Sequence, residues 1–262
     1  MNILLTGANG FVGSGLKRAF PEMIAAPSLR QISEEEITRL ADAYDVIIHT
    51  AAISDIGTCE KDPDASYRAN VLLPVYLARA CNGARKLICF SSDQVYSGCD
   101  EEGPYDENTA KPANTYAVHK LEMEQRVLDI CPDAVMLRAE WMYDYHTSRP
   151  NYLSLVMKAE QLAFSSKQYR GVTWLQEVAE TMPAVMKLPG GVYNFGSETN
   201  KSIYEITRDF VKVIGRQTTV EDAPPQHNLW MNCGKAKRHG VNFSTVEDAL
   251  KRCAMEYGLS MR

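Results

Sequence analysis

The 262-residue sequence lacks the features of a membrane protein, a nucleic-acid binder or a secreted protein. No apolar run reaches the roughly 18 residues that a transmembrane helix needs. Its 28 basic residues are outnumbered by 33 acidic ones, so a net charge of −5 leaves no basic excess to neutralise a phosphate backbone. The N-terminus has no charged segment followed by an apolar one, as a secretory signal would have. We therefore expect a cytoplasmic protein that binds no nucleic acid and no membrane.

The cysteines also exclude two classes of protein. Seven cysteines stand at positions 59, 81, 89, 99, 131, 233 and 253, an odd number without any CxxC pair. This pattern indicates neither a disulfide framework nor a zinc site. Reduced and mostly buried thiols are expected, and no metal site is expected. The composition, with 45% hydrophobic and 23% charged residues, is that of a globular domain.

Short apolar stretches alternate with helical patterns along the chain. The expected strands are residues 2–6, 23–26, 45–50, 86–90, 134–138 and 192–195. The expected helices are 11–20, 33–42, 63–81, 114–130, 152–164, 175–187, 202–213 and a last one from 244. This alternation indicates right-handed βαβ units and an α/β fold with a doubly wound parallel sheet. Ligands of such sheets bind beyond the carboxyl ends of the strands, which here are followed by residues 7–13, 27–30, 50–54, 91–96 and 139–143.

A glycine-rich turn follows the first expected strand. It reads Gly7-Ala8-Asn9-Gly10-Phe11-Val12-Gly13 and leads directly into a helix. Gly7 lets the chain turn tightly, Gly10 lets the backbone approach a pyrophosphate, and Gly13 lets the helix pack close to the sheet. The free N–H groups and the positive end of the helix dipole then face the phosphates. We therefore predict a Rossmann-type dinucleotide site that includes Gly7, Asn9, Gly10, Phe11, Val12 and Gly13.

The residues after the second strand bear on the choice of cofactor. A free ribose 2′-hydroxyl usually meets an Asp or Glu at this place. The stretch 26–30 contains no acid, and Ser28 and Arg30 are suited to hold a 2′-phosphate instead. The sequence thus favours NADP over NAD, although NAD remains possible. The alternative for Arg30 is an ordinary surface arginine.

A tyrosine and a lysine share one face of the expected helix 114–130. Tyr116 and Lys120 stand four residues apart, and no other of the 13 tyrosines has a lysine at that spacing. A carbonyl that accepts hydride develops negative charge on oxygen and needs a proton donor. A neighbouring ammonium favours the phenolate, so Lys120 is expected to lower the pKa of Tyr116. Ser92, just past the fourth strand, can hold the substrate oxygen, and a surface Tyr and Lys pair is the alternative.

Taken together, these motifs resemble the extended short-chain dehydrogenase/reductases, and most closely the dTDP-4-dehydrorhamnose reductases. The resemblance covers most of the chain. It is carried by residues 1–13, 49–52, 59–63 with Asn70, 91–96, 116 with 120, 138 with 141, and 191–195 with Ser202.

The resemblance implies roles for individual residues. Ser92, Tyr116 and Lys120 would be the catalytic triad, and the last two would also contact the cofactor. Further cofactor contacts would come from Thr50, Ala51, Ala52, Asn70 and Ser91. Asp93, Trp141 and Gln168 would lie at the substrate, although Trp141 has an equal reading as a core aromatic. Relatives often pair through the helices that correspond to 63–81 and 114–130, so a homodimer is implied by analogy.

The pair Asp93-Gln94 helps to choose the reaction. Sugar-nucleotide 4,6-dehydratases of this superfamily carry Asp-Glu there, so the missing Glu disfavours dehydration. The region 167–173 departs from the family's nucleotide pocket, where only Gln168 and Thr173 match. The expected function is an NADPH-dependent reductase that acts on a keto group of a nucleotide-linked sugar. The alternatives are a sugar-nucleotide epimerase with tightly bound NAD and a noncatalytic nucleotide-binding regulatory subunit.

The motifs also predict how the length is divided. Residues 1–140, completed by about 172–197, would form the NAD(P)-binding Rossmann domain. Residues 141–171 and 198–262 would form a small C-terminal substrate-binding lobe.

Overall fold

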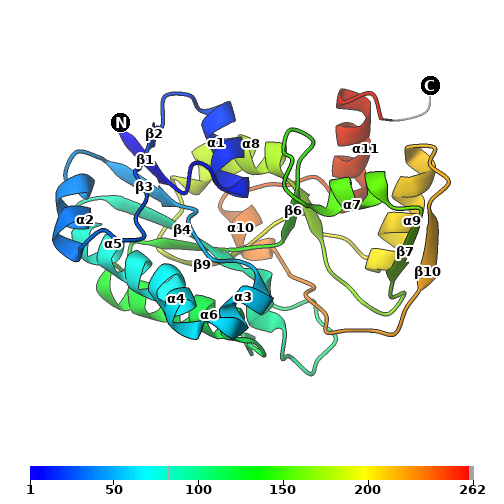
Figure 1. Ribbon diagram of the computed structural model, residues 1–262, viewed down its shortest axis with the longest axis horizontal. Helices are drawn as coiled ribbons and strands as arrows, with labels where there is room; N and C mark the ends of the chain where they lie inside the picture. The colour runs from blue at the N-terminus through cyan, green and yellow to red at the C-terminus, as the bar shows by residue number, and fades with distance from the viewer. Residues whose placement is uncertain (82, 260–262) are drawn as a thin grey trace.

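A six-stranded parallel sheet is the centre of the computed structural model, which describes residues 1–81 and 83–259 (Figure 1). Its strands are β1 (Ile3–Thr6), β2 (Ile24–Ala25), β3 (Val46–His49), β4 (Lys86–Ser92), β5 (Val135–Ala139) and β9 (Gly191–Phe195). They lie in the order β2-β1-β3-β4-β5-β9, and every neighbouring pair is parallel. The predicted doubly wound α/β fold is confirmed, and each of these strands overlaps a predicted one.

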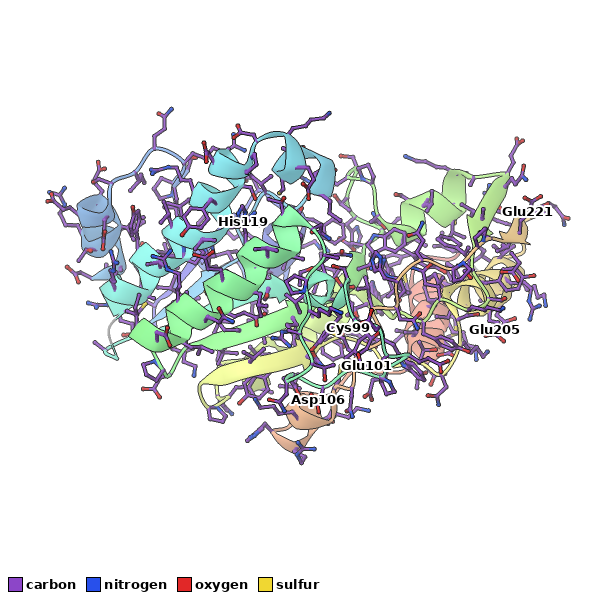
Figure 2. All side chains as sticks on the ribbon, turned by 90° about the horizontal axis from the view of Figure 1, so that it is seen from below. Cys99, Glu101, Asp106, His119, Glu205 and Glu221 are labelled. Carbon is purple, nitrogen blue, oxygen red and sulfur yellow. The ribbon has the colours of Figure 1, made fainter. Side chains whose placement is uncertain are left out.

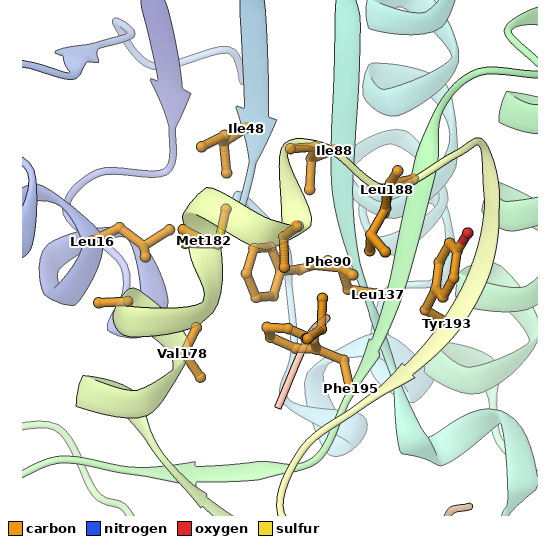
Figure 3. Close-up of a cluster of buried hydrophobic side chains, with 14 of the residues drawn as sticks. Leu16, Ile48, Ile88, Phe90, Leu137, Val178, Met182, Leu188, Tyr193 and Phe195 are labelled. Atoms are coloured by element: carbon orange, nitrogen blue, oxygen red, sulfur yellow. The ribbon is translucent and has the colours of Figure 1, made fainter. Parts of the chain in front are cut away.

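Helices cover both faces of this sheet. One face carries α1 (Phe11–Ala19) and α8 (Leu175–Val185), and the other carries α2 (Glu34–Ala41), α5 (Leu73–Cys81) and α6 (Thr115–Ile130). Successive strand residues point to opposite faces, so Ile48 and Ile88 pack toward α8 while Ile47 and Leu87 pack toward α5 and α6 (Figure 3). Burial on both faces explains why the strands are continuously apolar in sequence.

The predicted helix 63–81 contains a change of pitch. It consists of α4 (Pro63–Tyr67), a π-helical segment (Arg68–Leu72) and α5, and a short helix α3 (Ile56–Lys61) precedes it. π-helical turns occur frequently at functional sites. Here Arg68 and Ala69 of the wide turn line the main cleft of the molecule.

The C-terminal part has smaller sheets and a core of its own. Two parallel pairs, β6 (Trp141–Tyr143) with β8 (Val172–Trp174) and β7 (Gln161–Phe164) with β10 (Thr219–Asp222), lie among α7 (Tyr152–Lys158), α9 (Ile203–Val213) and α11 (Val246–Glu256). Glu205 of α9 and Glu221 of β10 lie at the far end of the molecule from His119 of α6 (Figure 2). Trp174 packs in this second core, although the sequence-based division assigned its strand to the Rossmann domain.

The prediction of one helix over residues 152–164 was wrong. The helix ends at Lys158, where Ala159 adopts extended backbone, and residues 161–164 form β7. Leu162 is buried while its neighbours Gln161 and Ala163 are exposed. This period of two fits a strand with one covered face, and β10 supplies the pairing partner from a distant part of the sequence.

Three further properties concern the whole described chain. Its helices include none that is both long enough and apolar enough to cross a bilayer. All seven cysteines are free, and only Cys99, labelled in Figure 2 on the loop with Glu101 and Asp106, is not fully buried. Residues 1–81 and 83–259 contain no group of acidic, histidine and cysteine side chains that suits a metal ion.

Candidate functional site

A cleft of about 1530 Å³ follows the carboxyl ends of β1 to β5. It exceeds the roughly 300–1,000 Å³ of a typical small-molecule pocket, so it has room for a dinucleotide and a second ligand. The predicted site residues that line it are Gly7, Asn9, Gly10, Phe11, Val12, Ser28, Arg30, Thr50, Ala51, Ala52, Ser91, Ser92, Asp93, Tyr116, Lys120 and Trp141. Gly13, Asn70 and Gln168 are not part of its wall.

The glycine turn has the close approaches that its sequence predicts. Gly7 has a φ of +71°, and a Cβ there would lie 2.6 Å from the Ala51 nitrogen. A Cβ on Gly13 would lie 2.1 Å from the Gly7 oxygen, so α1 can begin here only without that side chain. Gly10 caps α1 without any side-chain hydrogen bond, so the first N–H groups of the helix stay available to an anion. This turn therefore fits a pyrophosphate.

The Asn70 side chain holds the backbone of Ile53, in the loop after β3. Its Oδ1 accepts from the Ile53 nitrogen at 3.1 Å, and its Nδ2 donates to the Ile53 oxygen at 2.9 Å. Ile53 lines the cleft, whereas Asn70 is completely buried. Asn70 thus holds the loop after β3, and its direct contact with a cofactor stays a prediction.

The loop after β2 is held by an arginine that sequence reasoning missed. Arg68 donates from Nε to the Arg30 oxygen at 3.1 Å and from Nη2 to the Ile32 oxygen at 3.3 Å. Ser28 and Arg30 are exposed at the cleft edge. A 2′-phosphate placed here would thus meet two arginine side chains, those of residues 30 and 68.

The three predicted catalytic side chains lie in the middle of the cleft. Ser92 ends β4, and Tyr116 and Lys120 stand on the first turns of α6, which Asn114 caps by accepting from the Ala117 nitrogen. Lys120 donates from Nζ to the Phe90 oxygen at 2.7 Å, and its Nζ lies 5.8 Å from the centre of the Tyr116 ring. The arrangement places a hydroxyl, a phenol and an ammonium around one part of the cleft.

Burial has the largest effect on the pKa values of Tyr116 and Lys120. It raises the pKa of Tyr116 well above its usual range, and a hydrogen bond with Ser92 only partly opposes this rise. Burial also lowers the pKa of Lys120 to about 8. The expected lowering of the Tyr116 pKa by Lys120 is not seen, because desolvation of the phenolate is the largest effect and the opposing one comes from Ser92. Tyr116 is a protonated phenol at neutral pH.

Charged side chains gather at the opposite end of the cleft from the glycine turn. Arg170 donates from Nη2 to Asp93 Oδ2 at 3.1 Å, and its guanidinium carbon lies 5.2 Å from the centre of the Trp141 ring. Asp93 also accepts from the Ser92 hydroxyl at 3.1 Å. Glu140 precedes Trp141 and accepts from Thr173 Oγ1 at 2.7 Å.

The model of a family described as RmlD substrate binding domain matches residues 1–253. The chain belongs to this family. It is thus a dTDP-4-dehydrorhamnose reductase-like member of the extended short-chain dehydrogenase/reductases, a family of NAD(P)-dependent reductases. The predicted family is confirmed.

Individual relatives differ in how much they share. A dTDP-4-dehydrorhamnose reductase of Mycolicibacterium smegmatis is 32% identical over 54% of this chain, which spans only 46% of that protein. The probable low-salt glycan biosynthesis reductase Agl14 of Haloferax volcanii is 26% identical, over 95% of this chain and 92% of its own length. The dTDP-4-dehydrorhamnose reductase of Bacillus anthracis, solved in complex with NADP, superposes with a TM-score of 0.83 at 20% identity, over 98% of this chain and 99% of that one. The last likeness shows the shared fold.

The family's substrate residues are only partly in the expected places in this member. Gln168 donates its side-chain amide to the His227 oxygen at 3.1 Å, away from the cleft wall. Glu140 and Arg170 were not predicted, although both line the cleft. Glu140 lies in the window 139–143 after β5, which the strand-end rule had singled out. For Arg170 the only signal was its position two residues after Gln168.

A buried polar network supports β4 and β5 behind the catalytic side chains. Arg138 makes hydrogen bonds of 2.7 to 3.1 Å with both carboxylate oxygens of Glu124 and donates to the Tyr96 oxygen at 2.9 Å. The Ser91 hydroxyl donates to Glu124 at 2.5 Å. Ser91 thus faces the cleft while its hydroxyl is engaged inside the protein, which leaves Ser92 as the hydroxyl beside Tyr116.

Proposed function

We propose that the protein is an NADPH-dependent reductase of a keto group on a nucleotide-linked sugar, with Tyr116 as the proton donor. The observation that carries this proposal is that Tyr116, Lys120 and Ser92 share one cleft with the glycine turn. Membership of a family of NAD(P)-dependent reductases and the reductase names of its relatives support it.

The cofactor would occupy the end of the cleft formed by β1, β2 and β3. The backbone N–H groups after Gly10 would bind the pyrophosphate, and Ser28, Arg30 and Arg68 would surround a 2′-phosphate. The stretch 26–30 has no carboxylate that would repel that phosphate. When bound, the nicotinamide supplies the hydride. The NADP in the Bacillus anthracis relative agrees with this choice of cofactor.

The proton would come from the middle of the cleft. Ser92 would hold the carbonyl oxygen within reach of the Tyr116 hydroxyl. Because burial keeps Tyr116 protonated, the phenol has its proton in place when the substrate oxygen becomes an alkoxide, which is a stronger base than a phenolate. The O–H bond of Tyr116 breaks, an O–H bond to the product forms, and a phenolate remains. The Lys120 ammonium, 5.8 Å from the ring centre, stabilises that phenolate until solvent returns the proton.

Oxidation of NADPH, followed by absorbance, tests this function. The purified chain would be mixed with NADPH and dTDP-4-keto-6-deoxyglucose, with NADH as the comparison cofactor. We expect consumption of NADPH that depends on the keto sugar. NADPH that is not consumed with any nucleotide-linked keto sugar would contradict the reductase. Turnover without added cofactor, by protein that copurifies with NAD, would indicate the epimerase instead.

Tyr116→Phe tests the role of the phenol within the same assay. We expect kcat to fall by roughly 10²- to 10⁴-fold while NADPH still binds, because only the proton donor is removed. Tyr204→Phe on α9, outside the cleft, is the matched control and should turn over like the unaltered protein. Equal rates in the Tyr116→Phe variant and the unaltered protein would exclude Tyr116 as the donor.

A further inference from the structure

Three charged side chains are buried together at the substrate end of the cleft. The side chains of Asp93 and Arg170 are 5% and 17% exposed, and Glu140 is 7% exposed. All three line the cleft. They come from three separate segments, which follow β4, follow β5 and precede β8. Burying charged groups is costly, so such a cluster needs a reason beyond packing.

The Glu140 carboxyl lies in a space that two glycines keep open. A Cβ on Gly171 would lie 2.4 Å from both carboxyl oxygens, and a Cβ on Gly196 would lie 2.3 Å from Oε2. Thr173 donates to Oε2, and its own hydroxyl oxygen accepts from the Ser197 nitrogen at 2.9 Å. The Ser197 backbone also donates to this carboxyl. The carboxyl is therefore fixed in place in the wall of the cleft.

Charge balance decides the state of this carboxyl. Arg170 is already paired with Asp93, so an ionised Glu140 would be a buried anion without a partner of its own. Other ionisable groups near this cluster are His227, close to Arg170, Cys233, close to Glu140, and Tyr116, close to Asp93 and a neutral phenol at pH 7. Burial lowers the pKa of His227 and raises the pKa of the Cys233 thiol, so both are neutral at pH 7 and neither compensates a second anion.

The pKa of Glu140 agrees with this argument. Burial raises it to about 8, against the hydrogen bond from Thr173, and Asp93 adds to the rise while Arg170 opposes it. Burial raises the pKa of Asp93 too, but its pairing with Arg170 and the hydrogen bond from Ser92 oppose that rise. At neutral pH Asp93 is therefore the carboxylate beside the Arg170 guanidinium, and Glu140 is the carboxylic acid. A carboxylic acid can donate a hydrogen bond, whereas a carboxylate only accepts.

We propose that Glu140, Arg170 and Asp93 form the sugar-binding element of the cleft, in which Glu140 donates a hydrogen bond to an oxygen of an uncharged sugar. The chemical identity of the ligand rests on the proposed function. The element is neutral as a whole, which suits a sugar without a charge of its own. Arg170, stacked over Trp141 and paired with Asp93, sets the position of the cluster beside Ser92.

The element predicts how sugar binding depends on pH. Ionisation of Glu140 removes the donor and adds a negative charge beside a ligand whose diphosphate is already negative. The KM for the keto-sugar nucleotide should therefore rise about tenfold between pH 7 and pH 9, as a group with a pKa near 8 loses its proton. Lys120 also has a pKa near 8 and loses its proton over the same range, so a variant that removes only the Glu140 carboxyl is needed to separate the two groups.

Glu140→Gln tests this dependence. Gln keeps the shape and a donor at every pH, so the rise in KM for the sugar nucleotide should disappear in this variant. Glu160→Gln, an exposed carboxyl outside the cleft, is the matched control and should keep the rise. The same rise in KM in the Glu140→Gln variant as in the unaltered protein would overturn the proposal.

Two measurements separate this proposal from the proposed function. Calorimetric binding of dTDP-6-deoxyglucose, an alcohol that reduction of dTDP-4-keto-6-deoxyglucose yields, needs no turnover and should show the same contrast between Glu140 and Gln at pH 7 and pH 9. The infrared carbonyl band of a protonated carboxylic acid should be present at pH 7, vanish by pH 10, and be weaker in the Glu140→Gln variant. A chain without reductase activity that still shows both effects would refute only the function, whereas an infrared band unchanged by Glu140→Gln would refute the sugar-binding element.

Discussion

The two ends of the cleft are built from different parts of the protein chain. The cofactor end consists mainly of backbone from residues that are neighbours in sequence, Gly7 to Val12. Backbone segments come close together there because the glycines have no Cβ atom. The substrate end consists of the buried ionisable side chains of Asp93, Glu140 and Arg170, which come from three separate segments of the chain. A site made of backbone forms wherever the same local sequence occurs. A site made of side chains can be altered by substituting one residue at a time.

Removal of Lys120, between the two ends, should have the largest effect on turnover. In Lys120→Met we expect kcat to fall by at least about 100-fold, because the phenolate left on Tyr116 loses its cation. Single-turnover absorbance measurements with saturating NADPH and sugar would show this fall as slower chemistry. Lys111→Met, an exposed lysine outside the cleft, is the control and should leave kcat unchanged.

The same variant should show a pH-dependent gain in stability. Burial lowers the pKa of Lys120 from 10.5 to about 8, so between these pH values the unfolded chain binds the proton and the folded chain does not. Stability from this residue therefore rises with pH across that window, and below pH 8 its burial costs up to about 3 kcal/mol. Urea unfolding should show that the extra free energy of unfolding of Lys120→Met, relative to the unaltered protein, shrinks from pH 8 to pH 10. A stability difference that stays constant over this pH range would contradict the lowered pKa of Lys120.

The buried pair of Arg138 with Glu124, behind the catalytic side chains, should contribute more to stability than a surface pair. Arg138→Met leaves Glu124, 2% exposed, as a buried carboxylate without its cation, and we expect a loss of about 3–5 kcal/mol. The surface pair of Arg126 with Glu122 on the same helix offers a control, because Arg126→Met should cost less than about 1 kcal/mol. Urea unfolding measures both, and similar losses would show that the Glu124 pair is no more important than a surface one.

One added methyl group in the glycine turn, at the cofactor end of the cleft, should weaken both cofactor binding and stability. In Gly13→Ala the new Cβ meets the Gly7 oxygen at 2.1 Å, so we expect weaker NADPH binding and a loss of about 1–3 kcal/mol in stability. Gly57 in α3 has a conventional φ and open space, with its closest neighbouring atom at 3.6 Å. Gly57→Ala should therefore stabilise the protein by about 0.5–1 kcal/mol. Tight NADPH binding by Gly13→Ala would show that the turn tolerates a side chain.

How well each end could be predicted from sequence follows from the same contrast. The glycine turn and the Tyr116 and Lys120 pair depend on spacings of three and four residues, which a sequence displays directly. The central sheet was predictable for the same reason, because each strand is a continuous apolar stretch.

Contacts between distant segments were not predictable in that way. Glu140 and Arg170 stand 30 positions apart and meet only because β6 pairs with β8, two strands of three residues each. Asn70 was expected at the cofactor, but the structure directs its amide to Ile53. β7 was mistaken for helix because four residues show too little periodicity to identify a strand without its partner β10.

Substitution of Arg30 should give the smallest effect on activity. It should nevertheless distinguish NADPH from NADH, because the Arg30 side chain is expected to contact the 2′-phosphate that only NADPH carries. Arg30 is exposed, so a contact with a 2′-phosphate is partly screened by water, and we expect Arg30→Ala to raise the KM for NADPH only about tenfold. The KM for NADH should stay the same, since NADH has no phosphate at this position. Arg39→Ala on α2, outside the cleft, is the matched control. An equal rise for both cofactors would mean that Arg30 holds the loop rather than the phosphate, and discrimination would then belong to Arg68.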